Sequence, residues 1–400
     1  MFLCSDQASA NNSLSIQLII HTLKQINAYK IALGLAAICL LVALVMILNG
    51  SIHLAGPLLI IFFIALAIGF RGFDLTKGFA YTMMIFAAVT TALNYPSYFV
   101  QAGDFKFATL ITPLIQIIMF GMGTEMGIKD FAGVLKMPKA VLIGLVGHFT
   151  VMPLLGFSLA KAFGFPPEIA AGVVLIGSMP CGMASNVMSY LANANLALSV
   201  TLTAVATLLA PFLTPMWMKI LGGQFVEVDA LAMMWDIVKM VIIPIGAGLI
   251  FNKFFKGKAQ WLDKAMPIIS MLGIAFIITI ITAAGRDNLI VIGPALIICA
   301  LIHNTGGYLF GYWIGRLLGL KERDARTIAI EVGMQNGGLA SGLAKEMGKA
   351  ATIGLAPAVF GPLMNITGSI LASYWHRKPP VDKEDEPVEE PMGELAVKQT

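Results

Sequence analysis

A cluster of polar side chains interrupts a long apolar stretch at residues 330–342, IEVGMQNGGLASG. It contains one carboxylate, Glu331, two carboxamides, Gln335 and Asn336, and two adjacent glycines. A carboxylate inside a membrane-spanning helix costs roughly 2.5–3.5 kcal/mol even on an insertion scale. Glu331 therefore needs a cation, a proton or a buried partner, unless it lies close to the membrane interface.

Neutral oxygen atoms on nearby segments favour a cation. Ser199 and Thr203 are spaced i, i+4, so their hydroxyls share one helix face. Two hydroxyls alone more often pack helices together. Hard cations such as Na⁺ prefer oxygen ligands, and the candidates are Ser185, Asn186, Ser199, Thr203 and Gln335. Together with Glu331 they predict a cage for a cation with one fixed negative charge.

The remaining polar residues support other chemistry less well. Asp236 and Lys239 are spaced i, i+3 and are expected to pair with each other. Ser185 with His148 or His303 would offer a nucleophile and a base, which leaves an intramembrane enzyme as an alternative. No strained nucleophile turn and no third orienting group accompany them. The four cysteines lack the spacing of a metal site.

The composition indicates that membrane helices must position these groups. Of 400 residues, 58% are hydrophobic and 12% charged, against roughly 25% charged in soluble proteins. Long continuous apolar runs predict an all-α polytopic membrane protein, with the lipid bilayer as its surroundings. The net charge of +4 is small and its cations lie between the runs, so no nucleic-acid partner is expected.

Twelve spans are predicted, preceded by a polar segment, 1–29, without a cleaved signal peptide and followed by a disordered tail, 376–400. The spans cover 30–49, 56–71, 78–96, 107–124, 139–160, 167–192, 197–220, 229–251, 265–284, 289–315, 324–347 and 350–375. Alternate loops are rich in Lys and Arg, which predicts cytoplasmic termini in an inner or plasma membrane.

An internal repeat appears when the chain is shifted by 155 residues. The shift aligns His148 with His303, Gly156 with Gly311, Met179 with Met334 and Gly182 with Gly337. The repeat units, 78–220 and 229–375, hold five helices each, and an odd number inverts the second unit. Inverted repeats are typical of secondary transporters. The two extra N-terminal helices, in 30–77, lie outside the repeat.

The repeat pairs two expected helix breaks, SMPCGMASN at 178–186 and EVGMQNGG at 331–338. Pro180 lacks a backbone N–H, and the glycines weaken helix continuity. Two ordinary kinks are the alternative. Because both breaks carry polar side chains, they favour a site at membrane depth, where transporters use broken helices to bind ions.

Several ordered motifs resemble the bile acid:sodium symporter family across residues 78–375. They read IIMFGMGTEMGIKDF, SMPCGMASNVMSYLANANLALSVTLTAVATLLAPFLTP and EVGMQNGGLA. The resemblance implies ten helices in a panel and a core, with the fourth and ninth broken and crossing. It also implies two sodium sites: one of Ser185, Asn186, Ser199, Thr203 and Glu331, the other of Glu331, Gln335, the carbonyls of Val332 and Met334, and a side chain of the third family helix.

The chain departs from the family pattern at three places. That side chain is usually Gln and here is His148, which predicts a weaker or pH-sensitive second site. The crossing reads PCGM, with Met183, where the family often has Pro-Gly-Gly. In the last helix Met364 replaces a common His while Asn365 is kept. The expected substrate-facing residues are Asn336, Asn365, Met183 and Met364.

These observations predict a sodium-coupled symporter of an organic anion, such as a bile acid, a pantoate-like acid or a keto acid. Na⁺ is the coupling ion, and no other cofactor and no catalysis are expected. The main alternative is a transporter of the same fold with proton coupling or an export function, like the arsenite exporters. Cys181, at the crossing, keeps that alternative open.

Overall fold

The protein is almost entirely helical. The computed structural model describes residues 27–73, 76–127, 133–255 and 260–380, so most of the predicted polar N-terminal segment and of the tail lies outside the described residues. After a first helix, Asn27–Leu48, the helices of the first half are α2 (Ile52–Phe70), α3 (Ala80–Asn94), α4 (Ser97–Val100), α5 (Ile111–Glu125), α7 (Gly133–Lys136), α8 (Pro138–Phe163), α9 (Pro167–Gly177), α10 (Ala184–Leu191) and α11 (Leu196–Ile220).

The second half continues in the same way. Its helices are α12 (Ala230–Ile237), a π-helical turn η4 (Val238–Ile242), α13 (Ile243–Phe255), α14 (Gln260–Ala284), α15 (Arg286–Leu317), α16 (Glu322–Gly333), α17 (Gly337–Glu346) and α18 (Leu355–His376). Strands β1 (Gln101–Ala102) and β2 (Phe105–Lys106) form a small antiparallel hairpin. α18 ends at His376, the residue at which the disordered tail is predicted to begin.

Seven helices of the described residues are long and apolar enough to cross a membrane: Asn27–Leu48, Phe107–Glu125, Pro138–Phe163, Leu196–Gln224, Ala230–Phe255, Arg286–Leu317 and Leu355–His376. The chain is therefore an integral membrane protein with several spans. The other five predicted spans fall on the shorter helices α2, α3 and α14 and on two pairs, α9–α10 and α16–α17, that are each interrupted. The count of twelve and the inverted repeat stay predictions.

Local chemistry explains where several helices begin and end. α8 ends at Gly164, whose φ of 62° is a left-handed conformation that glycine adopts without strain. α9 starts with a proline at its first position, where the missing N–H has no intrahelical partner to lose. Side-chain oxygens of Asn195 and Asp229 cap α11 and α12 by accepting backbone N–H groups.

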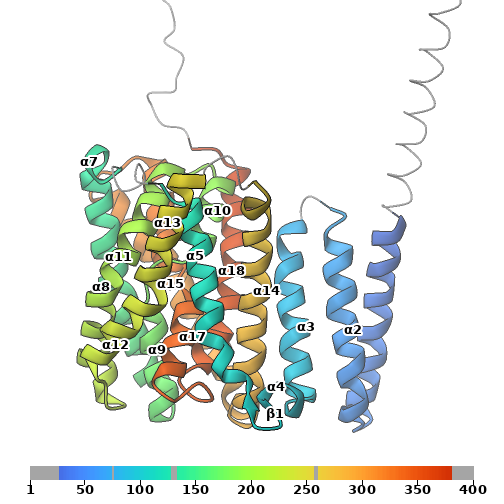
Figure 1. Ribbon diagram of the computed structural model, residues 1–400. Helices are drawn as coiled ribbons and strands as arrows, with labels where there is room; N and C mark the ends of the chain where they lie inside the picture. Colours follow the sequence, from blue (N-terminus) through green and yellow to red (C-terminus); the bar gives the residue numbers. More distant parts are fainter. Residues whose placement is uncertain (1–26, 74–75, 128–132, 256–259, 381–400) are drawn as a thin grey trace, which may run out of the picture.

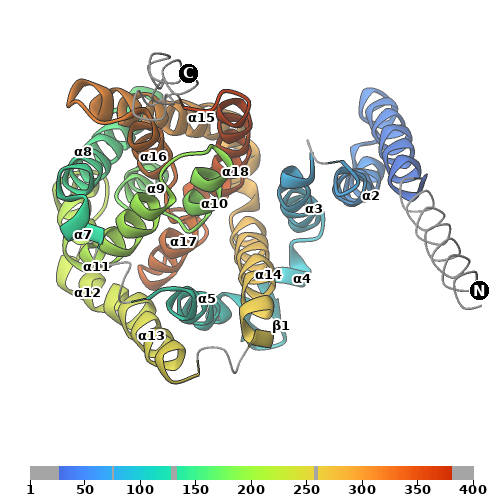
Figure 2. The ribbon, with the colours of Figure 1, turned by 90° about the horizontal axis from the view of Figure 1, so that it is seen from above.

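The helices form one main bundle with an appendage (Figures 1 and 2). The first helix and α2 lie to one side, and α3 lies between them and the bundle. α3 contacts both α2 and α14. Within the bundle, α5 packs against α13 and α14, whereas α15 packs against α8, α16 and α18. The two broken helices lie among these packed helices. α9 contacts α8 and α18, and α17 contacts α18 and α5.

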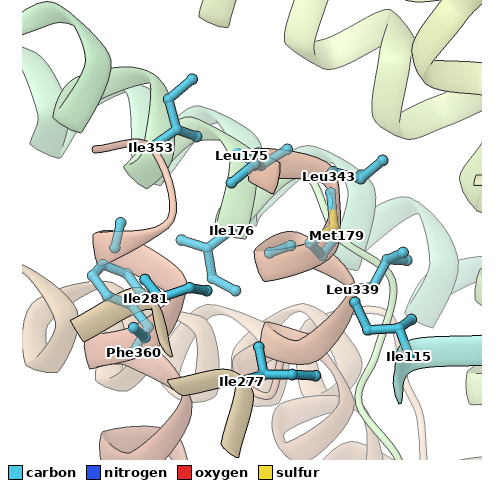
Figure 3. Packing of buried hydrophobic residues seen from close by; sticks show 14 of the residues in the cluster. Ile115, Leu175, Ile176, Met179, Ile277, Ile281, Leu339, Leu343, Ile353 and Phe360 are labelled. Carbon is cyan, nitrogen blue, oxygen red and sulfur yellow. The ribbon is translucent and has the colours of Figure 1, made fainter. Parts of the chain in front are cut away.

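A large apolar cluster fills the half of the bundle around α9 and α17 (Figure 3). Leu175 and Ile176 of α9 and Leu339 of α17 are fully buried in it, with Phe360 of α18 and Ile281 of α14. Burying a large apolar side chain contributes roughly 1.5–3 kcal/mol. This cluster leaves the polar atoms of the two breaks at its edge.

Candidate functional site

The two helix breaks pair with each other by backbone hydrogen bonds. Gly182 N donates to Met334 O at 3.1 Å, and Asn336 N donates to Pro180 O at 2.9 Å. Cys181 and Gln335 thus face each other in a short antiparallel bridge. A Cβ added at Gly182 would lie 2.8 Å from Gln335 O, so this approach requires glycine. Both predicted breaks are confirmed, and each satisfies part of the other's backbone.

Four of the predicted cation ligands surround the Glu331 carboxylate. Ser199 Oγ donates to Glu331 Oε1, and Thr203 Oγ1 donates to Glu331 Oε2 at 2.9 Å. Asn186 Oδ1 lies 2.9 Å from Ser199 Oγ and 3.3 Å from Thr203 Oγ1. Ser185 Oγ lies 3.5 Å from Thr203 Oγ1 and donates to Gly182 O. Six side-chain oxygens from α10, α11 and α16 therefore converge, and we call this set the Glu331 cage.

The Glu331 cage suits a small hard cation. Glu331 is 1% exposed, and Ser185, Ser199 and Thr203 are fully buried. Among the described ion pairs, none joins Glu331 to a lysine or arginine. A buried carboxylate without a cationic partner is costly, and its surrounding neutral oxygens are the ligand type that Na⁺ takes. The residues present thus fit a bound sodium ion.

The residues of the expected second site lie next to the cage. His148 of α8 contacts both breaks: its Nε2 is 2.8 Å from Met179 O and its Nδ1 is 3.1 Å from Glu331 O. Gln335 Nε2 donates to Val332 O at 2.7 Å, and Met334 O accepts from Gly182 N. These groups are together, but most of their oxygens already have protein partners.

A cavity of about 600 Å³ adjoins the two breaks. All four predicted substrate-facing residues line it: Met183, Asn336, Met364 and Asn365. Asn336 also caps α17, because its Oδ1 accepts Leu339 N at 3.0 Å. Met364 Sδ lies 3.1 Å from Gln335 N. The lining also includes Gly78 in the turn before α3, Glu125 at the end of α5 and Ser369 within α18.

The cage and the cavity share a wall. Asn186 and Thr203 belong to the cage and also line the cavity, as does Gln335 beside it. The first residues of α10 and α17, Ala184 and Gly337, line the cavity too. Helix N-termini carry partial positive charge, so both favour an anion at this place.

α17, which lines the cavity, packs against α5, α12 and α14. Thr112 Oγ1 of α5 donates to Glu346 Oε1 at the end of α17, at 2.5 Å. A Cβ at Gly342 would lie 2.3 Å from Ile115 Cδ1, so α17 and α5 approach closely there.

Lys239 pairs with Asp236 at 3.1 Å, as the spacing predicts.

Comparison with known proteins identifies the family. The model of the Sodium Bile acid symporter family matches residues 112–292. The chain is 37% identical over 301 residues to the Uncharacterized sodium-dependent transporter YocS of Bacillus subtilis, covering 75% of this chain and 91% of that protein. The chain belongs to the sodium bile acid symporter family. The predicted resemblance is therefore confirmed.

Two further relatives show the range of this family. The Probable sodium/metabolite cotransporter BASS1, chloroplastic, of Arabidopsis thaliana is 35% identical over 271 residues, covering 68% of each chain. The Ileal sodium/bile acid cotransporter of Oryctolagus cuniculus is 32% identical over 243 residues, covering 58% of this chain and 68% of that protein. As a member of the family, this chain is a sodium-dependent transporter and not an enzyme.

The geometry agrees with a symporter-family protein rather than with an intramembrane hydrolase. Ser185 Oγ bonds to Gly182 O and Thr203, while the two His148 ring nitrogens face backbone carbonyls, so the two residues do not form a nucleophile–base pair. His303 instead lies 3.1 Å from Met152 O. Cys181 is 1% exposed and is not among the residues that line the cavity in the described chain.

Sequence reasoning missed the cavity wall opposite the breaks. α3, α5 and α14 contribute it, with Thr82, Met119, Met122, Ser270 and Met271 among the lining residues. Thr82 and Ser270 are buried polar residues. In the sequence, only these two hydroxyls could have indicated a cavity wall here. Isolated hydroxyls on membrane helices more often serve helix packing.

Proposed function

We propose that the chain is a sodium-coupled symporter of an organic anion, in which Na⁺ binds in the Glu331 cage and the anion binds in the adjoining cavity. The observation that carries the proposal is the shared wall: Asn186 and Thr203 face both. A sodium ion that orders these side chains also shapes the anion site. Such a shared wall provides the coupling free energy that symport needs.

The cavity chemistry supports an anion with an apolar body. Eight methionines line it, namely Met119, Met122, Met126, Met183, Met188, Met271, Met334 and Met364, and no lysine, arginine or histidine is in the described lining. Methionine adapts to irregular apolar shapes. The negative charge is offset instead by the sodium ion and by the N-termini of α10 and α17. Bile acids, pantoate-like acids and keto acids all carry such a charge.

Transport follows from alternate opening of the cavity. We place the open side at the end of α5, because Glu125 and Met126 line the cavity, and the closed side at the start of α5, where Thr112 bonds to Glu346 and neither residue lines it. With both termini in the cytoplasm of a cell bounded by an inner or plasma membrane, this arrangement is the inward-facing one. Na⁺ drives the cycle only if it binds one state more tightly than the other.

Thermal unfolding of the purified protein tests the proposal. Na⁺ should raise the unfolding temperature where K⁺ does not, because a ligand that binds only the folded state stabilises it. Glu331→Gln should abolish the sodium effect. Glu227→Gln is the matched control, since it makes the same chemical change at an exposed residue.

Organic anions of the three classes are then added with Na⁺ or K⁺. An anion that stabilises the protein more in Na⁺ than in K⁺ supports coupled binding. If Na⁺ has no effect on the wild type, or if Glu331→Gln responds to Na⁺ as the wild type does, the proposal is wrong.

A further inference from the structure

His148 occupies the position at which a second sodium ion is expected. The ring is 1% exposed and comes from α8, between the two breaks. Its Nε2 lies 2.8 Å from Met179 O, in the first break, and its Nδ1 lies 3.1 Å from Glu331 O, on α16. The neutral ring has one N–H, so one nitrogen donates to its carbonyl and keeps no lone pair for a cation, while the other nitrogen is an acceptor. Cys181 Sγ lies within reach of Nδ1 as a thiol donor to that acceptor.

The position of the ring is fixed from further directions. Cys181 Sγ lies 3.6 Å from Nδ1, and the Phe149 ring meets the imidazole edge to face at 5.0 Å between centroids. His148 and Cys181 are both departures from the family pattern, and they touch each other. The ring cannot rotate to free a nitrogen without breaking contacts to both breaks.

The oxygens of the expected second site are also engaged. Val332 O accepts Gln335 Nε2 at 2.7 Å, and Met334 O accepts Gly182 N at 3.1 Å. Within the described part of the chain, Gln335 Oε1 is the one oxygen of this set that is buried without a hydrogen-bond partner. Each of the two carbonyls keeps one lone pair, but Na⁺ needs several oxygens around a space of its own, and the His148 ring fills the space between the breaks.

We infer that this transporter binds one sodium ion, in the Glu331 cage, and that the His148 side chain takes the place of a second ion by joining the two breaks itself. The inference rests on the proposed function, since it assumes that the cage binds Na⁺. It makes His148 a positioning residue: its ring lies between the Met179 and Glu331 carbonyls, donates its one N–H to one of them and fills the space that an ion would need.

The same geometry predicts a gain of binding. In His148→Gln, the amide oxygen can point at the space now filled by the ring. The carbonyl of Glu331 and Gln335 Oε1 would then face that space with no imidazole between them. Three or more oxygens would surround it, which is the start of a sodium site.

Counting bound ions tests the inference. Radioactive sodium is titrated onto the purified full-length protein, and the number of ions bound per transporter at saturation is measured. We expect one for the wild type with a Hill coefficient of about one, and two for His148→Gln with a coefficient above one. His303→Gln is the matched control and should bind one, because His303 bonds to Met152 O and does not contact the cage.

The wild-type count decides the matter even if His148→Gln fails to fold. Two ions on the wild type would overturn the inference while leaving the proposed function intact. One ion on a His148→Gln protein that unfolds at the wild-type temperature would also overturn it. No sodium binding by the wild type, or unchanged binding by Glu331→Gln, would overturn the proposed function and the inference with it.

Discussion

At the scale of single residues, the Glu331 cage combines one charge with neutral oxygens that differ in what they contribute. Thr203 Oγ1 is the most connected of these oxygens, with contacts to Glu331, Asn186 and Ser185. Its removal takes away a proposed sodium ligand and also a donor to the carboxylate. The charge stays, so the cage should be weakened rather than abolished.

Thr203→Val keeps the side-chain shape and removes this hydroxyl. A hydrogen bond to a charged group contributes roughly 1.5–3 kcal/mol, so we expect a ten- to hundredfold loss of sodium affinity in the binding titration. Thr207→Val is the control, since Thr207 Oγ1 bonds to Thr203 O one turn away and does not touch Glu331. Equal losses in the two variants would assign the effect to α11 and not to the cage.

Sequence reasoning could predict the cage because its members are rare in apolar helices. Glu331 stands out by charge, and Ser199 and Thr203 by their spacing. The engagement of His148 could not be predicted, because it depends on the Met179 carbonyl, just beyond the end of α9, and the Glu331 carbonyl, in the last turn of α16. Such contacts leave no pattern in side-chain types.

At the scale of elements, the pairing of the two breaks sets the position of the cage residues on α10 and α16. α10 and α17 each start at a break, and α16 ends there, where Asn304 Nδ2 donates to the Gly333 carbonyl at 2.5 Å. The orphan backbone groups of two helix ends are thus satisfied inside the membrane protein. A change that separates the breaks should therefore affect sodium binding without touching a ligand.

Gly182→Ala makes that change. Its Cβ would meet Gln335 O at 2.8 Å, and a backbone carbonyl held in a bridge cannot move aside cheaply. Overpacking of this kind costs roughly 1–3 kcal/mol, so the unfolding temperature and the stabilisation by Na⁺ should both fall.

Gly337→Ala is the matched control at the other break. Its nearest contacts would be ordinary, with Gly361 Cα and Pro357 O at 3.5 Å. We expect wild-type stability and sodium response. A Gly182→Ala protein that behaves like Gly337→Ala would show that the close approach of the breaks is not needed.

The sequence predicts these elements better than it predicts their packing. Glycine and proline mark both breaks, and most predicted span limits lie within a few residues of the observed helix ends. The π-helical turn η4 was not predicted, because one widened turn keeps the same apolar composition as its neighbours. The contact of α17 with α5 was also missed, since it joins apolar surfaces far apart in the chain.

At the scale of the whole molecule, transport requires that the closed side of the cavity opens. α17 contacts α5, α12 and α14 on that side, and Figure 1 shows α17 beside α5. The polar link between the two groups is the Thr112–Glu346 hydrogen bond, with Lys345 paired to the same carboxylate at 2.9 Å. Because Thr112 belongs to one group of helices and Glu346 to the other, this bond must break when the cavity opens there.

Thr112→Val removes the donor of that bond and keeps its shape. A hydrogen bond contributes about 1 kcal/mol net, so the state open on the Glu346 side should become roughly fivefold more populated. Ser341→Cys reports this change, because Ser341 is buried on α17 and lines the cavity. We expect an impermeant maleimide added from the Glu346 side to label it several-fold faster in the Thr112→Val background.

The labelling experiment needs a protein in which no other thiol reacts with the maleimide, and a matched control variant. Cys39, Cys181 and Cys299 are buried, and Cys4→Ser removes the remaining thiol. Thr109→Val is the control, because Thr109 Oγ1 bonds to Lys106 O within its own segment and does not reach α17. If Thr112→Val and Thr109→Val give the same labelling rate, the Thr112–Glu346 bond does not hold the cavity closed. A faster rate in Thr112→Val alone, reversed by saturating Na⁺, would show that the ion site and the far side of the cavity belong to one equilibrium.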